Sequence, residues 1–138
     1  MRKILPYCLL LLGFNCLAAD TSIGPALGTY TSYTEADWGV GFELKAGGKA
    51  VVMTEYSYEY DKNNKKIEHQ KTVTGTWEYK APHLVLSYGF FKDKLIQSRN
   101  CVEKQPCFKY VGPLEKGSVK SPLNIKYDFI NWTAGQDY

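Results

Sequence analysis

The stretch that decides the fold is TEYSYEYDKNNKKIEHQKTVTGTWEYK, residues 54–80. Tyr56, Tyr58 and Tyr60 occupy every second position near its start, with polar residues between them. A period of two is typical of a β-strand, because successive side chains point to opposite faces of a sheet. The polar run DKNNKK then interrupts the pattern before a second strand-like segment begins. The stretch therefore predicts a long β-hairpin.

The aromatic spacing resumes in the second strand of this hairpin, at Trp77 and Tyr79. A row of rings on one face could form a packed core, line a ligand cavity or offer a binding surface. Two rows that pair across one hairpin favour the interior, where each cross-strand aromatic pair contributes about 0.2–1 kcal/mol. We therefore expect Tyr56 and Tyr58 to be mostly buried. The predicted core aromatic row consists of Tyr56, Tyr58, Tyr60, Trp77 and Tyr79.

The same alternation recurs on both sides of the hairpin, without the longer period that marks a helix. Gly47 and Gly48 form a second turn signal, since glycine adopts positive φ at little cost. About eight short strands joined by short turns predict an all-β fold, a single antiparallel meander closed as a barrel or folded as a sandwich. The expected strands are residues 27–33, 38–45, 49–60, 67–79, 84–88, 92–98, 108–111 and 124–131.

Residues 1–19 have the order of a secretory signal peptide. Arg2 and Lys3 precede a short apolar run, and small residues follow it. The run is shorter than the roughly 20 residues that a membrane-spanning helix needs. We expect cleavage after Ala19, with Ala18 as the alternative, and a single domain at residues 20–138.

Cys16 raises a second possibility, because a bacterial lipoprotein signal also ends in a cysteine that becomes lipidated. The preceding Phe14 and Asn15 fit that signal poorly. An exported protein, periplasmic or secreted, without a transmembrane segment is therefore the favoured prediction. Lipid anchoring at Cys16 is the less favoured alternative.

The charge balance argues against partners that are strongly charged. The chain has 17 basic and 14 acidic residues, and loss of Arg2 and Lys3 leaves fifteen basic residues, a net charge of about +1. A nearly neutral protein has no electrostatic reason to bind nucleic acid or an anionic membrane. We expect neither, and interpret Lys62, Lys65 and Lys66 as a solvated hairpin tip.

Two cysteines remain after cleavage, Cys101 and Cys107 in the segment CVEKQPC. Export to an oxidising compartment favours a disulfide between them. A redox pair is usually spaced as Cys-x-x-Cys, and a zinc site needs further ligands nearby. We therefore predict a structural disulfide, with the redox and metal alternatives open.

No residue pattern indicates catalysis. His69 and His83 are the two histidines, and neither accompanies a nucleophile motif. Glu55 and Glu59 alternate with tyrosines, where carboxylates usually face solvent. The sequence therefore predicts no catalytic residue, no metal, no cofactor and no enzymatic activity.

Three segments resemble small lipocalin-like barrels of bacterial exported proteins. They are GTY at residues 28–30, FELKAGGKAVV, and TGTWEYKAPHLVLSYG. In such proteins a Gly-x-Tyr or Gly-x-Trp opens the first strand, a glycine hairpin follows, and Gly-x-Trp precedes an apolar strand. The resemblance covers residues 27–88 and implies a barrel with a binding role, and no catalytic residues to transfer.

Together these features predict an exported, non-enzymatic binding protein. The favoured function is a module of inhibitor or immunity type that binds another periplasmic or extracellular protein through barrel-end loops, because loops on rigid scaffolds often carry function. The alternative is a small carrier whose interior holds an apolar or amphipathic ligand. The candidate binding residues are Tyr33, Trp38, Phe90, Phe91 and Lys104.

Overall fold

The computed structural model describes residues 24–33, 38–99, 101, 106–114 and 120–131. These residues form a closed β-barrel in which each strand pairs antiparallel with the next one along the chain. The predicted all-β antiparallel meander is confirmed, and it closes as a barrel rather than a sandwich. Residues 1–19 and their cleavage sites lie outside the described residues. Within the described part, no helix has the length and apolar character that a membrane crossing requires.

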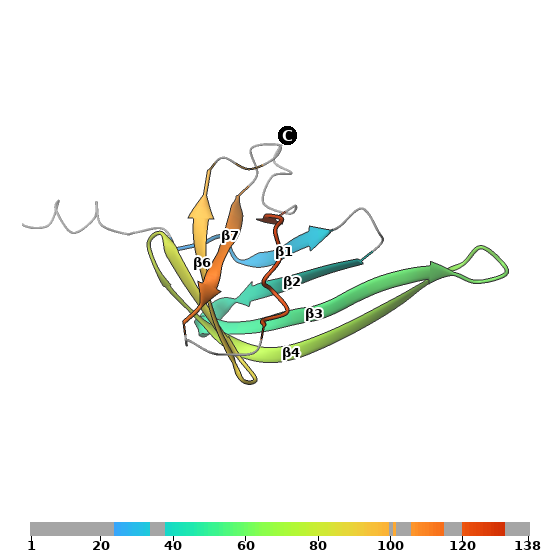
Figure 1. Cartoon of the computed structure of the whole chain (residues 1–138), viewed down its shortest axis with the longest axis horizontal. Helices are drawn as coiled ribbons and strands as arrows, with labels where there is room; N and C mark the ends of the chain where they lie inside the picture. Colours follow the sequence, from blue (N-terminus) through green and yellow to red (C-terminus); the bar gives the residue numbers. More distant parts are fainter. Residues whose placement is uncertain (1–23, 34–37, 100, 102–105, 115–119, 132–138) are drawn as a thin grey trace, which may run out of the picture.

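The described residues form eight strands and one short turn of 3-10 helix, arranged as Figure 1 shows. Most strand bounds agree with the sequence prediction to within two residues, because the alternation and the turn residues mark them clearly. The elements are β1 (Gly28–Tyr33), β2 (Trp38–Lys45), η1 (Ala46–Gly48), β3 (Lys49–Tyr60), β4 (Lys66–Lys80), β5 (His83–Tyr88), β6 (Phe91–Ser98), β7 (Cys107–Pro113) and β8 (Phe129–Ile130).

The barrel is closed by β8, which pairs with β1 on one side and with β7 on the other. The prediction of a strand over residues 124–131 is wrong, since only two of these residues form one. The backbone N–H of Asn124 donates to the carbonyl oxygen of Ser121, and that of Ile125 donates to Leu123. These turns replace the expected ladder and allow the side chain of Leu123 to enter the core.

The interior of the barrel is filled by aromatic and leucine side chains. Tyr30 and Phe42 stack with ring centroids 5.2 Å apart, and Phe108 meets the Tyr30 ring edge-on at 5.0 Å. Phe129 lies 5.4 Å from Phe42. All four side chains are buried, so the body is stabilised mainly by removal of apolar surface from water.

Gly75 of β4 explains how β5 packs so tightly at the barrel wall. A Cβ atom built there would overlap the backbone carbonyl oxygen of Ser87 on β5. Only glycine therefore permits this close approach. The pairing of Gly75 with Tyr88 is also the last one between β4 and β5.

Candidate functional site

The first candidate site is the part of the β3–β4 hairpin that extends past the barrel, residues 54–60 and 66–74, here called the arm (Figure 1). The strand β2 accompanies β3 as far as Ser57. On the other side, the described part of β5 pairs with β4 only from Gly75 to Lys80. The arm is therefore mostly a two-stranded ribbon with solvent on both faces.

A β-bulge in β3 sets the orientation of the arm. Met53 pairs with Thr72 of β4, but the next pair joins Glu55 to Lys71, so β3 has one extra residue there. The pairing with β2 shifts at the same point, which places the extra residue in β3 itself. A slip of one residue moves the following side chains to the opposite face. Every residue of β3 beyond the bulge is therefore inverted relative to a regular strand.

This bulge overturns part of the predicted core aromatic row. Trp77 and Tyr79 pack against the core, as expected. Tyr56 lies opposite Gln70, whose position along β4 is on the face away from Trp77, because directly paired residues share a face. The prediction that Tyr56 and Tyr58 are mostly buried is wrong, since both are half-buried and outside the core cluster, and Tyr60 is 59% exposed.

The three tyrosines instead form a surface row on the outer face of the arm. The ring centroids of Tyr56 and Tyr58 are 6.4 Å apart, and those of Tyr58 and Tyr60 are 5.9 Å apart. The Lys66 ammonium lies 4.6 Å from the Tyr58 centroid, within range of a cation–π interaction. With Glu68, these residues are here called the tyrosine face.

Polar contacts hold the tyrosine face in one arrangement. The Lys66 ammonium donates to the Glu68 carboxylate at 2.7 Å and to the Tyr56 hydroxyl at 3.2 Å. The Tyr56 hydroxyl donates to Glu68 at 3.0 Å. The bond from Lys66 to Glu68 is the main cause that raises the pKa of Lys66 and lowers the pKa of Glu68. The rings therefore need little further ordering to make contact with a partner.

The opposite face of the arm is polar. The Lys71 ammonium lies 2.7 Å from the Glu55 carboxylate, and His69 lies 3.3 Å from Glu59. All four side chains are well exposed, so these pairs contribute little to stability. They keep this part of the face hydrophilic, whereas Ile67 and Val73 on the same face are 38% and 37% exposed. The aromatic contact area of the arm lies on the tyrosine face.

The predicted binding residues that the structure describes lie on separate elements. Phe90 is 99% exposed in the turn between β5 and β6, whereas the neighbouring Phe91 packs against Tyr88 with centroids 5.4 Å apart. Trp38 is half-buried against the core. Tyr33 pairs with Gly39 at the end of β1, and its side chain is outside the described part. Lys104 also lies outside the described residues.

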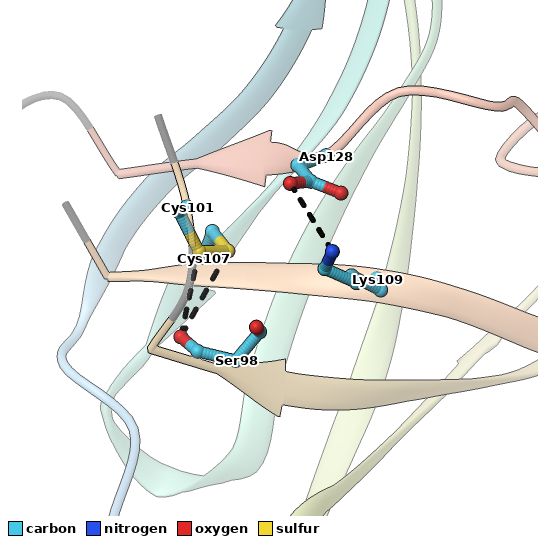
Figure 2. Close-up of polar contacts among 5 residues, drawn as sticks. All are labelled: Ser98, Cys101, Cys107, Lys109 and Asp128. Carbon is cyan, nitrogen blue, oxygen red and sulfur yellow. Dashed lines mark hydrogen bonds and ion pairs between the residues drawn. A yellow bond between two sulfur atoms is a disulfide. The ribbon is translucent and has the colours of Figure 1, made fainter. Parts of the chain in front are cut away.

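The predicted disulfide between Cys101 and Cys107 is confirmed. Figure 2 shows both sulfur atoms beside the carbonyl oxygen of Ser98, at 3.5 Å from Cys101 and 3.8 Å from Cys107. The Asp128 carboxylate is within 4.8 Å of both sulfurs and 3.7 Å from the Lys109 ammonium. Because the disulfide consumes both thiolates, Asp128 is the one anionic donor left in this group. The geometry favours a structural disulfide that fixes β7 to the chain after β6.

A buried polar network inside the barrel was missed by the sequence analysis. Asp93 of β6 is fully buried, and its carboxylate accepts hydrogen bonds from Tyr88 at 2.6 Å and from Ser121 at 2.5 Å. The hydroxyl of Tyr110 donates to the other carboxylate oxygen at 3.1 Å. Asp93 alternates with Leu95 along β6, so a period-two reading of this strand would have placed it inside.

The network connects β5, β6, β7 and the segment before β8. Burial is the main cause that raises the pKa of the Tyr88 hydroxyl, and it raises the pKa of Tyr110 to about 12 with help from the Asp93 charge. Tyr88, Asp93 and Ser121 are buried, and Tyr110 is half-buried. The arrangement therefore fits a structural role rather than a catalytic one.

No protein-family model, curated protein or solved structure matches this chain. The resemblance to lipocalin-like exported proteins stays a prediction.

Proposed function

We propose that this protein is an exported, non-enzymatic binding module of inhibitor or immunity type that binds a partner protein through the arm. The tyrosine face carries the proposal. It holds three neighbouring aromatic rings on a ribbon that extends past the barrel. Lys66 and Glu68 hydrogen-bond Tyr56, and the Lys66 ammonium also lies over the Tyr58 ring. Tyrosine is enriched at the energetic centres of protein interfaces, because it offers a large apolar area and a polar hydroxyl.

Export is part of the proposal and has two supports. Residues 1–19 have the composition of a secretory signal, and the disulfide between Cys101 and Cys107 is of a kind that persists in oxidising compartments. The partner is then expected in the periplasm or outside the cell.

The packed interior favours protein binding over the carrier alternative. A carrier needs an internal space for its ligand, but Tyr30, Phe42, Phe108 and Phe129 fill the middle of this barrel in mutual contact. Two hollows exceed the roughly 300 Å³ that a small molecule needs. They have volumes of about 540 and 490 Å³, are partly open to solvent and lie outside this core, where Tyr79 and Ala81 line both. The surface of the arm is therefore the better candidate for recognition than the inside of the barrel.

The experiment is affinity capture from a periplasmic extract with immobilised mature protein. We expect one stoichiometric protein partner, and we expect the double variant Tyr58→Ala/Tyr60→Ala to weaken its binding at least about tenfold. The matched control is Tyr127→Ala, since Tyr127 is 53% exposed and lies outside the arm. Equal retention by both variants, or recovery of a bound apolar small molecule in place of a protein, would refute the proposal.

A further inference from the structure

The open edge of β4 is a second feature of the arm, distinct from the side chains of the tyrosine face. From residue 66 to residue 74, β4 pairs with β3 on one side, and no described strand pairs with it on the other. Figure 1 shows this edge along the length of the arm. An unpaired strand edge presents backbone N–H and C=O groups that can template a further strand.

The direction of these backbone groups follows from one contact. The carbonyl oxygen of Lys71 accepts a hydrogen bond from the Thr54 hydroxyl at 3.4 Å, so it points toward β3. Backbone groups alternate between the two sides of a strand. Those of Gln70 and Thr72 therefore point to the open side, where an added strand would receive them.

The charges on the edge disfavour a second copy of this chain in some registers of the added strand, although an axis at Ile67 would place Lys66 opposite Glu68. Two β4 edges related by a two-fold axis at Gln70 would place Lys71 of one copy opposite His69 of the other. An axis at Lys71 or at Glu68 would place like charges directly opposite each other, which is destabilising. A segment of a different protein avoids these contacts.

The two ends of the edge differ in chemistry. Near the barrel, the edge is uncharged and β-branched at Thr72, Val73 and Thr74, and Val73 is 37% exposed. The turn that ends β5 begins beside this end, since Tyr88 pairs with Gly75, and it carries the fully exposed Phe90. The end of the edge near the barrel is therefore suited to contact an apolar residue of an added strand.

The hairpin tip is cationic. Lys62 and Lys65 are exposed, and among the described residues neither has an ion pair. The nearby Asp61 carboxylate is occupied by the backbone N–H groups of Asn63 and Lys65, at 2.8 and 2.9 Å. This end of the edge therefore complements an acidic residue or a terminal carboxylate.

We propose that an extended segment of the partner protein adds to residues 66–74 of β4 as an antiparallel strand, with an apolar start near Val73 and an acidic end near Lys62 and Lys65. An antiparallel strand there continues the direction of β5. Main-chain hydrogen bonds supply affinity in this mode, and alternate side chains supply specificity. The inference rests on the proposed function of the arm and names the chemistry of its partner.

The test uses synthetic eight-residue peptides and the full mature chain labelled with nitrogen-15. The probe peptide alternates valine and threonine and ends in two glutamates; a second peptide has the reverse order. We expect saturable chemical-shift changes in the amides of residues 66–74 with the probe peptide. The reversed peptide should bind about fivefold more weakly, and so should the probe at high salt, which screens the lysines.

Methylation of the peptide nitrogens supplies a matched control that leaves the protein unchanged. Methyl groups on the alternate nitrogens that face β4 should weaken binding about tenfold or more, because they remove main-chain hydrogen bonds. Methyl groups on the nitrogens that face away should leave affinity within about twofold. On the protein side, Gln70→Pro should also weaken binding, since proline removes the outward N–H.

Several outcomes would overturn the inference. The first two are the absence of saturable binding by either peptide and equal affinity of the two methylated peptides. The others are chemical-shift changes confined to the tyrosine face, and binding of a ten-nucleotide thymidine strand that is tighter than binding of the probe peptide. Self-association that Gln70→Pro abolishes would make a second copy the occupant instead. If a partner is captured through the tyrosines but the peptides fail, the strand addition is wrong and the proposed function stands.

Discussion

The barrel and the arm share the strands β3 and β4, yet the two regions are stabilised in different ways. In the barrel, β3 contributes Val52 to a core of buried rings and leucines. In the arm, the same strand carries half-buried and exposed tyrosines held by one lysine and one glutamate. Burial dominates the first region, and local surface contacts dominate the second. The comparison teaches that the barrel determines stability, which leaves the arm free to serve recognition.

The strongest test of this division is a core truncation. Phe42→Ala removes a ring that packs against Tyr30, Phe108 and Phe129, and should cost about 3–5 kcal/mol of unfolding free energy. Urea denaturation followed by tryptophan fluorescence gives the value. Tyr60→Ala in the arm is the control and should cost less than about 1 kcal/mol. Similar losses for both variants would remove the distinction between the regions.

The buried network makes a second prediction for the barrel. Asp93→Ala deprives the hydroxyls of Tyr88, Ser121 and Tyr110 of their shared acceptor, and should cost about 2–4 kcal/mol. Thermal or urea unfolding measures the loss, with Glu78→Ala, an exposed carboxylate of β4, for comparison. A variant as stable as the parent would mean that the network is not structural.

The disulfide should have a smaller effect on the barrel. The double variant Cys101→Ser/Cys107→Ser opens a loop with a sequence separation of 6 and should cost about 2 kcal/mol, mainly through the entropy of the unfolded chain. Urea unfolding of the variant and of the chemically reduced parent should agree. Amide exchange in the arm should not change, and faster exchange there would contradict the separation of the two regions.

Alkaline pH should weaken the barrel through its buried tyrosines. The pKa of Tyr110 rises from 10.0 to about 12, so the folded protein favours the neutral phenol. Its stabilising effect is complete below a pH of about 10, where unfolded tyrosine is also neutral, and is lost as the pH rises toward 12. Urea midpoints at increasing pH should therefore fall, and Tyr110→Phe should show a shallower decline; equal slopes would count against this origin.

The smallest effect on stability is expected in the arm. Tyr58→Ala removes the ring between Tyr56 and Tyr60 and the cation–π contact with Lys66, and should cost less than about 1 kcal/mol of global stability. Hydrogen exchange should nevertheless quicken in the arm, because local contacts hold it. A large loss of global stability would show that the arm belongs to the folding unit of the barrel.

The parts of the fold that could be predicted follow from local patterns. The disulfide was predicted because Cys101 and Cys107 are the two cysteines left after the expected cleavage and export. Alternation and turn residues located β2, β3 and β5 closely. These features depend on residues that are close together in the sequence. The meander topology follows from them, since consecutive strands joined by short turns pair with each other.

The features that could not be predicted depend on contacts between distant segments. Thr54 gives no sign in the sequence that β3 has an extra residue there, so the face of the tyrosines was assigned wrongly. Likewise, Ser121 meets Asp93 across 28 positions, a distance that no local pattern spans. The length of the arm was also hidden, because the sequence does not show where β5 leaves β4.

The bulge between Met53 and Glu55 gives insertions and deletions an unusual meaning in this chain. Removal of the extra residue there would leave Glu55 opposite Lys71 and Tyr56 opposite Gln70, so the tyrosines would keep their face and the barrel before Met53 its register. Loss of a single codon at this point would thus make the strand regular and preserve the partner-facing surface. For protein engineers, the same position marks the boundary between the barrel, which serves as a scaffold, and the arm, which can be redesigned for binding.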